Sequence, residues 1–209
     1  MPFEYGKNAV HKTCLLWYNQ NMKNNVEQSK TQNDLILFAE RANAMIESKY
    51  ILAAKKISSL LKGIVSISYL MDTVSHCLKN FSYANEFARN RKLVPDGSQV
   101  KSKLTLPNDK TRLFTFVFCL LAEIDSGERD LTKFLNEYFD APSLNDSYQS
   151  FCADVIIPFK KAGESIIKEV TLTLKMRLLW SKGWRFLMLN QFMLHQVSMT
   201  LFFRFCQKL

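Results

Sequence analysis

A long apolar stripe with helical spacing, over residues 35–78, constrains the fold of this chain more than any other feature. Its members recur at intervals of three, four and seven residues, which puts them on one face of an α-helix. They are Leu35, Phe38, Ala42, Met45, Ile46, Ala53, Ile57, Leu60, Leu61, Ile64, Ile67, Met71, Val74 and Leu78. Asn33 and Asp34 precede the stripe, and their side chains suit the N-cap of a helix. The stripe therefore predicts a helical core.

Gly63 lies in the middle of the stripe. Glycine lowers helix propensity by about 1 kcal/mol relative to alanine. We therefore expect a kink or a break at Gly63 or near Ser48–Tyr50.

A shortage of turn-forming residues extends the helical prediction to the rest of the chain. Only 6 Gly and 5 Pro occur in 209 residues. All-β folds need a turn at intervals of about 8–12 residues, and these two residues build most of them. Hydrophobic residues make up 47% and charged residues 22%, which excludes disorder as the general state. We predict an all-α fold, an irregular bundle of five to seven helices.

Two further helical segments are expected before residue 126. Residues 81–92 predict a short helix with Ser82 as its cap. Residues 109–125, capped by Asn108, form a run with little polar surface, typical of a buried helix. Four of its residues are expected to be among the most buried of the fold: Phe114, Val117, Phe118 and Leu121.

Helical spacing returns after residue 129. Residues 130–139 carry one apolar face, and a last helix is expected from Asn145 or Asp146 to Val170. Pro158 falls inside that helix, where it removes a hydrogen bond and clashes with the preceding turn. The sequence predicts a kink there.

Residues 93–106 interrupt the helical pattern. Pro95, Asp96 and Gly97 form a turn signature, and residues 101–106 alternate between polar and apolar side chains. This segment predicts a short loop or a minimal β-ribbon near 93–106.

The two ends of the chain differ from its centre. We divide the chain into a polar N-terminal arm, 1–33, a helical domain, 34–170, and an atypical basic, apolar tail, 171–209, which contains no Asp or Glu. Thr171–Lys175 alternates like a strand, and 176–206 combines aromatic and cationic residues as a membrane-surface element does. Three alternatives stay open for the tail: a final core helix, a membrane element, or a sequence foreign to the fold, as after a reading-frame change.

The formal net charge of +9 is unevenly distributed. Residues 89–112 hold seven cations against two acids, whereas 113–154 are acidic overall. Phosphate binding needs clustered, exposed cations, so this basic segment is the candidate nucleic-acid site. Its cations are Arg89, Arg91, Lys92, Lys101, Lys103, Lys110 and Arg112. The competing interpretation is either a solvated loop or an internal partner for the acidic stretch 123–154.

Motifs for catalysis, cofactors or metals are missing from the sequence. It has no nucleophile elbow, P-loop or dinucleotide-binding glycine pattern. The His11–Cys14 and His76–Cys77 pairs have no second pair to complete a metal site. The acids Glu123, Asp125, Glu128 and Asp130 lie at a helix–loop–helix junction, where capping and solvation account for them. We therefore expect no catalytic residues, no cofactor and no metal.

The five cysteines are odd in number and scattered, which favours a reducing compartment. Residues 1–10 lack the apolar region of a signal peptide, so we expect a cytoplasmic protein. The favoured function is a non-enzymatic helical interaction module, an adaptor or assembly protein with a protein partner. The alternatives are nucleic-acid binding through 89–112 and, more weakly, peripheral membrane binding through 176–206.

Overall fold

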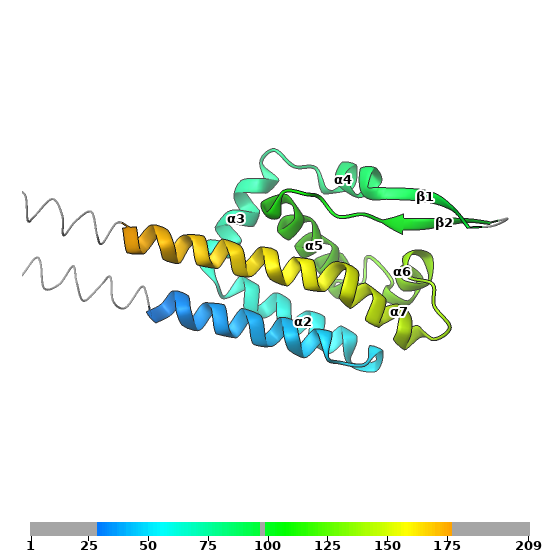
Figure 1. The fold of residues 1–209 in the computed structure, drawn as a ribbon, viewed down its shortest axis with the longest axis horizontal. Helices are drawn as coiled ribbons and strands as arrows, with labels where there is room; N and C mark the ends of the chain where they lie inside the picture. Colours follow the sequence, from blue (N-terminus) through cyan, green and yellow to red (C-terminus); the bar gives the residue numbers. More distant parts are fainter. Residues whose placement is uncertain (1–28, 97–98, 177–209) are drawn as a thin grey trace, which may run out of the picture. The chain divides into compact units, whose positions relative to one another are not determined.

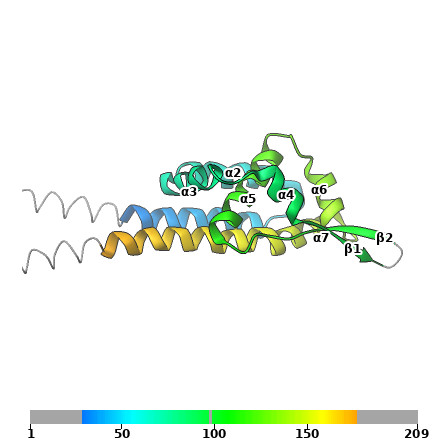
Figure 2. The same cartoon turned by 90° about the horizontal axis from the view of Figure 1, so that it is seen from above.

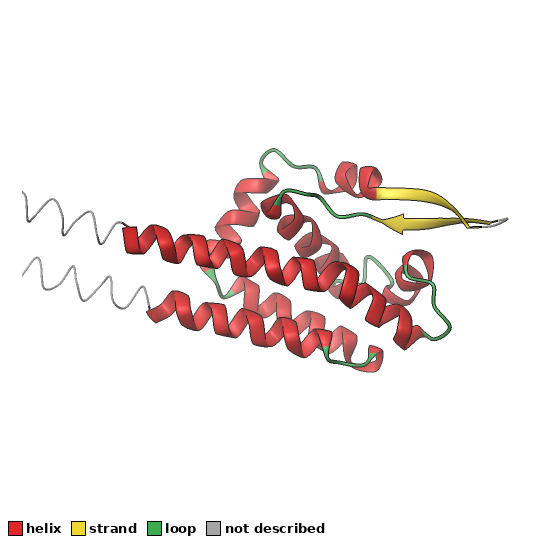
Figure 3. Cartoon of the chain, in the orientation of Figure 1, coloured by secondary structure: helices red, strands yellow, loops and turns green. Residues whose placement is uncertain are grey.

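The computed structural model describes residues 29–96 and 99–176 (Figure 1). The chain divides into two compact units, residues 30–170 and the two ends, 1–29 with 171–209. The fold below is that of the unit 30–170. In the described part of the chain it consists of helices and one two-stranded ribbon, so the all-α prediction is confirmed (Figure 3).

The helices and strands follow one another with short connections. After a first helix over 29–46 come η1 (Tyr50–Leu52), α2 (Ala53–Val65), α3 (Ser68–Leu78), α4 (Tyr83–Asn90), β1 (Arg91–Asp96), β2 (Gln99–Leu104), α5 (Lys110–Asp125), α6 (Leu131–Tyr138), α7 (Leu144–Phe151), a π-helical turn (Cys152–Ile156) and a last helix over 157–176. The first and last helices run side by side over much of their length (Figures 1 and 2).

The apolar stripe folds into three helices rather than one. Most of its residues are fully buried, from Phe38 to Val74, whereas Leu78 is exposed. One predicted break is confirmed, because residues 47–49 leave the helix. The second lies at Ser66–Ile67, where the chain bends by 92° between α2 and α3. Gly63 stays inside α2, and a Cβ at that position would overlap the side chain of Arg41.

The expected N-cap at Asn33 or Asp34 is wrong, because residues 29–34 are already helical. Asp34 has a different role: one of its carboxylate oxygens accepts a hydrogen bond from the hydroxyl of Tyr69, at 3.1 Å. The carboxylate thus ties the first helix to α3. Burial, together with this carboxylate, raises the pKa of Tyr69.

Helix α5 is central to the core and packs against both α2 and α3. Phe114, Val117 and Leu121 are buried as predicted, but Phe118 is only half-buried. Phe116, and not Phe118, faces inward beside Tyr83 and Phe87 of α4. The N-cap is Asp109, one residue after the predicted Asn108, because its carboxylate accepts the Arg112 amide at 2.8 Å.

A cluster of three phenylalanines joins the first helix, α5 and the last helix. Phe114 and Phe159 stack at 4.7 Å between ring centroids, and Phe38 meets Phe159 edge-on at 6.0 Å. Gly163 makes room for them, because a Cβ there would lie 2.5 Å from Phe38 Cε1 and 2.9 Å from Phe114 Cε2.

Pro158 follows a π-helical turn. The Ile157 amide donates to the Cys152 carbonyl, five residues back. A π turn shifts the hydrogen-bond pattern by one residue, so the chain continues as a helix through a position that has no N–H to give.

Ser143, rather than Asn145 or Asp146, caps α7. The strand expected over Thr171–Lys175 is wrong, because residues 157–176 are one helix.

The predicted β-ribbon is present and extends beyond α4 (Figure 1). Its antiparallel register pairs Arg91 with Leu104, Lys92 with Lys103, and Val94 with Lys101. Leu104 is buried and β2 packs on α6. At the end of the ribbon next to α4, the face that carries Arg91 and Leu104 is therefore the one packed against the helices.

No single helix in the described part of the chain has the length and apolarity of a membrane span. The bent pair Tyr50–Val65 and Ser68–Leu78 reaches that threshold by length and composition.

Candidate functional site

Three of the seven predicted cations are paired with carboxylates from distant parts of the sequence. Arg91 pairs with Glu137 of α6 at 2.9 Å, and Arg112 with Glu86 of α4 at 2.9 Å. Lys110 pairs with Glu169 of the last helix. Only Glu137 lies in the acidic stretch, so Arg91 alone pairs as the competing interpretation expected, whereas Arg112 and Lys110 pair with carboxylates outside that stretch.

Three other cations are exposed: Arg89, Lys92 and Lys103. None of them has an ion pair within the described ranges. Lys92 and Lys103 are direct cross-strand neighbours, and Arg89 lies three residues before Lys92 in the last turn of α4. The side chain of Lys101 lies outside the described part. The structure therefore brings together only a subset of the predicted site, which we call the ribbon cations: Arg89, Lys92 and Lys103.

A second polar cluster connects α4, α5 and the loop before α6. Glu123 Oε2 accepts from Arg129 Nε at 2.8 Å and from the Tyr83 hydroxyl at 3.0 Å. The Arg129 guanidinium also lies over the ring of Phe87, 4.2 Å from its centroid. Burial, with Glu123 beside it, raises the pKa of Tyr83, so the phenol stays neutral. Because every charge has its partner, the cluster is a structural clamp.

A third cluster is buried beneath the connection between the first helix and α2. The hydroxyls of Ser48 and Tyr148 lie 2.9 Å apart, and Tyr148 donates to the Met45 carbonyl at 2.9 Å. Gln149 Nε2 donates to the Ser48 carbonyl, also at 2.9 Å. Residues 45–48 are thus fastened to α7 by groups that lie far along the chain.

The turn that follows, η1, is fastened in the same way. The Tyr50 hydroxyl lies 2.6 Å from Thr132 Oγ1 of α6, and the Tyr50 amide donates to Asn145 Oδ1 of α7 at 3.1 Å. The next residue, Ile51, is 86% exposed, and Leu52 is 46% exposed. A well-anchored backbone therefore holds two large apolar side chains in solvent. We call Ile51 and Leu52 the apolar knob.

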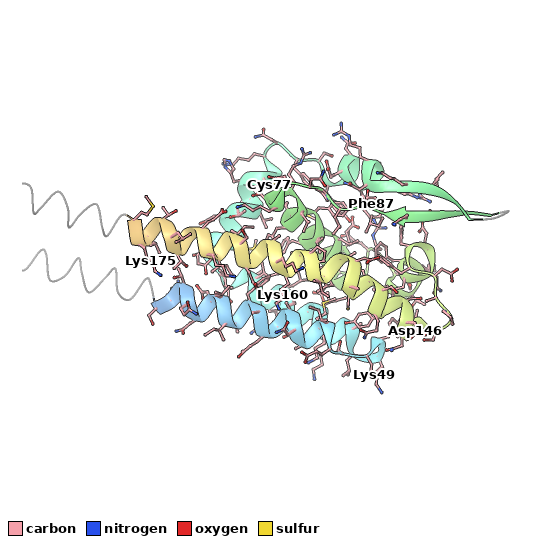
Figure 4. All side chains as sticks on the ribbon, in the orientation of Figure 1. Lys49, Cys77, Phe87, Asp146, Lys160 and Lys175 are labelled. Carbon is pink, nitrogen blue, oxygen red and sulfur yellow. The ribbon has the colours of Figure 1, made fainter. Side chains whose placement is uncertain are left out.

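Charged residues of both signs surround the knob. Glu47, Lys49 and Lys55 are exposed on its own segment. Asp146 of α7 is exposed next to Asn145, and Figure 4 shows Lys49 and Asp146 at the same end of the unit. The exposed surface at this turn therefore combines two apolar side chains with charged groups of both signs.

Two cysteines of the described part, Cys119 and Cys152, are poor nucleophiles because their pKa is raised. Burial raises the pKa of Cys152 to about 11, and burial with nearby Glu123 raises that of Cys119 to about 11. Reactive cysteines are thiolates at neutral pH, whereas these two remain thiols.

Three of the four acids at the junction, Glu123, Asp125 and Asp130, have structural partners. Asp130 caps α6 by accepting the Lys133 amide at 2.8 Å, and Asp125 accepts from the Ser58 hydroxyl. Within the described ranges no group of three or more His, Cys, Asp or Glu residues could hold a metal ion. The His11–Cys14 pair, every tail cation except Lys175 and nearly all of the 176–206 membrane candidate lie outside these ranges.

The knob is the feature that sequence reasoning missed. A signal was present, because Ile51 and Leu52 are apolar residues that fall between members of the stripe without belonging to it. No protein-family model matches the chain, and no curated protein or solved structure matches it either.

Proposed function

We propose that this chain is a non-enzymatic helical interaction module that binds a partner protein through the apolar knob. The observation that carries the proposal is the 86% exposure of Ile51 on a turn fastened by hydrogen bonds to α6 and α7. An exposed apolar side chain on a mobile loop loses conformational entropy when it binds. A fastened turn has already lost it, so more of the contact energy becomes affinity.

The surroundings of the knob favour a protein over a lipid surface. Anionic headgroups would repel the exposed Glu47 and Asp146 and attract only Lys49 and Lys55, whereas a protein surface can complement both signs. A protein pocket can present an apolar floor to Ile51 and groups of either sign to Glu47 and Lys49. The free thiols of Cys77, Cys119 and Cys152 support the further proposal that the partner is met in the cytoplasm.

Site-specific photo-crosslinking tests the proposal. A photoreactive amino acid replaces Ile51 in one variant of the full chain and Val65 in another. Val65 is a matched control, because it is 58% exposed at the other end of α2, roughly 20 Å away at 1.5 Å per residue. The expected result is one defined protein adduct from position 51 that recurs with the purified partner and is missing from position 65.

Two results would count against the knob. Equal adducts from both positions would mean that the contact is non-specific. If the photoreactive group at position 51 crosslinked to anionic lipid and not to a protein, the knob would bind a membrane and the proposed protein partner would be wrong.

A further inference from the structure

We propose that the ribbon cations Arg89, Lys92 and Lys103 bind the phosphate backbone of double-stranded DNA. The site lies on other elements than the apolar knob and does not rest on the protein partner proposed above. It consists of the last turn of α4 and the outward face of the ribbon that follows.

The ribbon register brings two like charges together. Lys92 and Lys103 are directly opposite each other, where the Cβ atoms of a cross-strand pair are about 5 Å apart. Like charges at that separation destabilise a ribbon unless an anion neutralises them. Both side chains are exposed, and no carboxylate in the described part of the chain pairs with either. A phosphate group supplies the missing negative charge.

The two faces of the ribbon differ in whether their cations have carboxylate partners. On the opposite face, Arg91 pairs with Glu137 of α6 and its strand neighbour Leu104 is buried. The carboxylate of Glu137 is thus used on the packed side, whereas neither Lys92 nor Lys103 has a carboxylate partner among the described side chains.

Helix α4 directly precedes the ribbon and adds no exposed negative charge. Its one acid, Glu86, faces inward and pairs with Arg112. The outward positions are Ala84, Asn85, Ala88 and Arg89, all of them exposed. Asn85 and Arg89 stand one helical turn apart, and both side-chain types donate hydrogen bonds to phosphate oxygens in DNA complexes.

The junction between α4 and β1 fixes the two halves of this surface relative to each other. The Asn90 carbonyl accepts from the Thr105 amide at 2.8 Å and from the Thr105 hydroxyl at 3.0 Å. Asn90 Nδ2 in turn donates to the Glu86 carbonyl at 2.9 Å. The helix end and the ribbon base are therefore held as one element.

Duplex DNA fits this element better than duplex RNA does. The major groove of B-form DNA, about 12 Å wide, admits a helix or a two-stranded ribbon. The major groove of A-form RNA is deep and narrow, so side chains cannot reach its base edges. The expected complex has α4 or the ribbon in the groove and the lysines on the adjoining phosphates.

The test is fluorescence anisotropy of a labelled DNA duplex of about 20 base pairs, titrated with the full chain at several salt concentrations. One variant combines Lys92→Gln with Lys103→Gln. The matched control combines Lys62→Gln with Lys161→Gln, two exposed lysines of α2 and the last helix, and so removes the same charge. Circular dichroism checks that both variants remain folded.

The slope of log affinity against log salt is negative, and loss of two phosphate contacts should make it less steep by about 1.8, with binding weakened by tens of fold at about 0.1 M salt. The control should change the slope by less than about half of that amount. An RNA duplex of the same sequence should bind more weakly than the DNA.

Three results would overturn the proposal. The first is no DNA binding by the wild-type chain at low salt. The second is an equal loss in the control variant, which would mean a diffuse charge effect. The third is variant-sensitive binding of duplex RNA or of phosphatidylserine vesicles at least as strong as that of DNA, which would assign the cations to another anion. None of these results bears on the knob, because photo-crosslinking at position 51 tests it independently.

Discussion

Replacement of Gly163 by alanine should destabilise the fold, although alanine is the better helix former. The added Cβ would lie 2.5 Å from Phe38 Cε1 and 2.9 Å from Phe114 Cε2, far inside van der Waals contact. Both rings are fully buried, and Phe114 is stacked on Phe159, so they cannot move freely. Overpacking of this kind costs about 1–3 kcal/mol or more, whereas the gain in helix propensity is about 1 kcal/mol. We expect a net loss of up to roughly 2 kcal/mol, the difference of these two terms.

Gly63→Ala provides the matched control. A Cβ at position 63 would meet only the side chain of Arg41, which can swing towards solvent at the cost of its hydrogen bond to the Ser59 carbonyl. The propensity gain and the lost bond are each about 1 kcal/mol, so the free energy of unfolding should change by less than about 1 kcal/mol. Urea unfolding of both variants, followed by circular dichroism, measures the difference. A Gly163→Ala variant as stable as Gly63→Ala would refute the packing of the phenylalanine cluster.

Three further predictions concern charge and protonation. Lys103→Gln should raise the free energy of unfolding by about 0.2–1 kcal/mol, since it removes a like-charge pair, and a clear loss in thermal denaturation would contradict the register. Glu123→Gln should lower the free energy of unfolding by about 1–3 kcal/mol, because Arg129 and Tyr83 lose their shared acceptor. Glu128→Gln, at an exposed position, should lower it by less than about 0.5 kcal/mol in the same urea assay. Folding raises the pKa of Cys119 and Cys152 from 9.0 to about 11. Their contribution to the free energy of unfolding is therefore complete below pH 9 and is lost as the pH rises through 11. Chemical denaturation at a series of pH values measures this loss, and a free energy of unfolding that rose between pH 9 and 11 would contradict the burial of the two thiols.

The sequence predicted most of the helices because their apolar spacing is a local property. The stripe from Phe38 to Val74 is core, and the ribbon near 93–106 forms where turn residues interrupt the pattern. The bend at Ser66–Ile67 was missed because neither residue is a helix breaker. Tertiary burial accompanies the bend: Ile64, just before it, and Ile67, within it, are both fully buried.

The candidate site was less predictable than the fold, because partners in space are distant in sequence. Arg91 and Arg112 looked available as ligand-binding cations, but Glu137 and Glu86 neutralise them through tertiary contacts. The rigid display of Ile51 depends on Thr132 and Asn145, more than 80 residues away along the chain. Composition and periodicity contain no information on such pairs.

The affinity of the crosslinked partner for two alanine variants tests the central claim most directly. A side chain that anchors an interface from a preorganised turn should behave as a hot spot, with a loss above about 1.4 kcal/mol on truncation. Isothermal titration calorimetry with purified proteins should therefore find that Ile51→Ala weakens binding at least about tenfold, while Val65→Ala changes it less than about twofold. Equal affinity of the two variants, with both folded, would contradict the claim that the knob is the binding site.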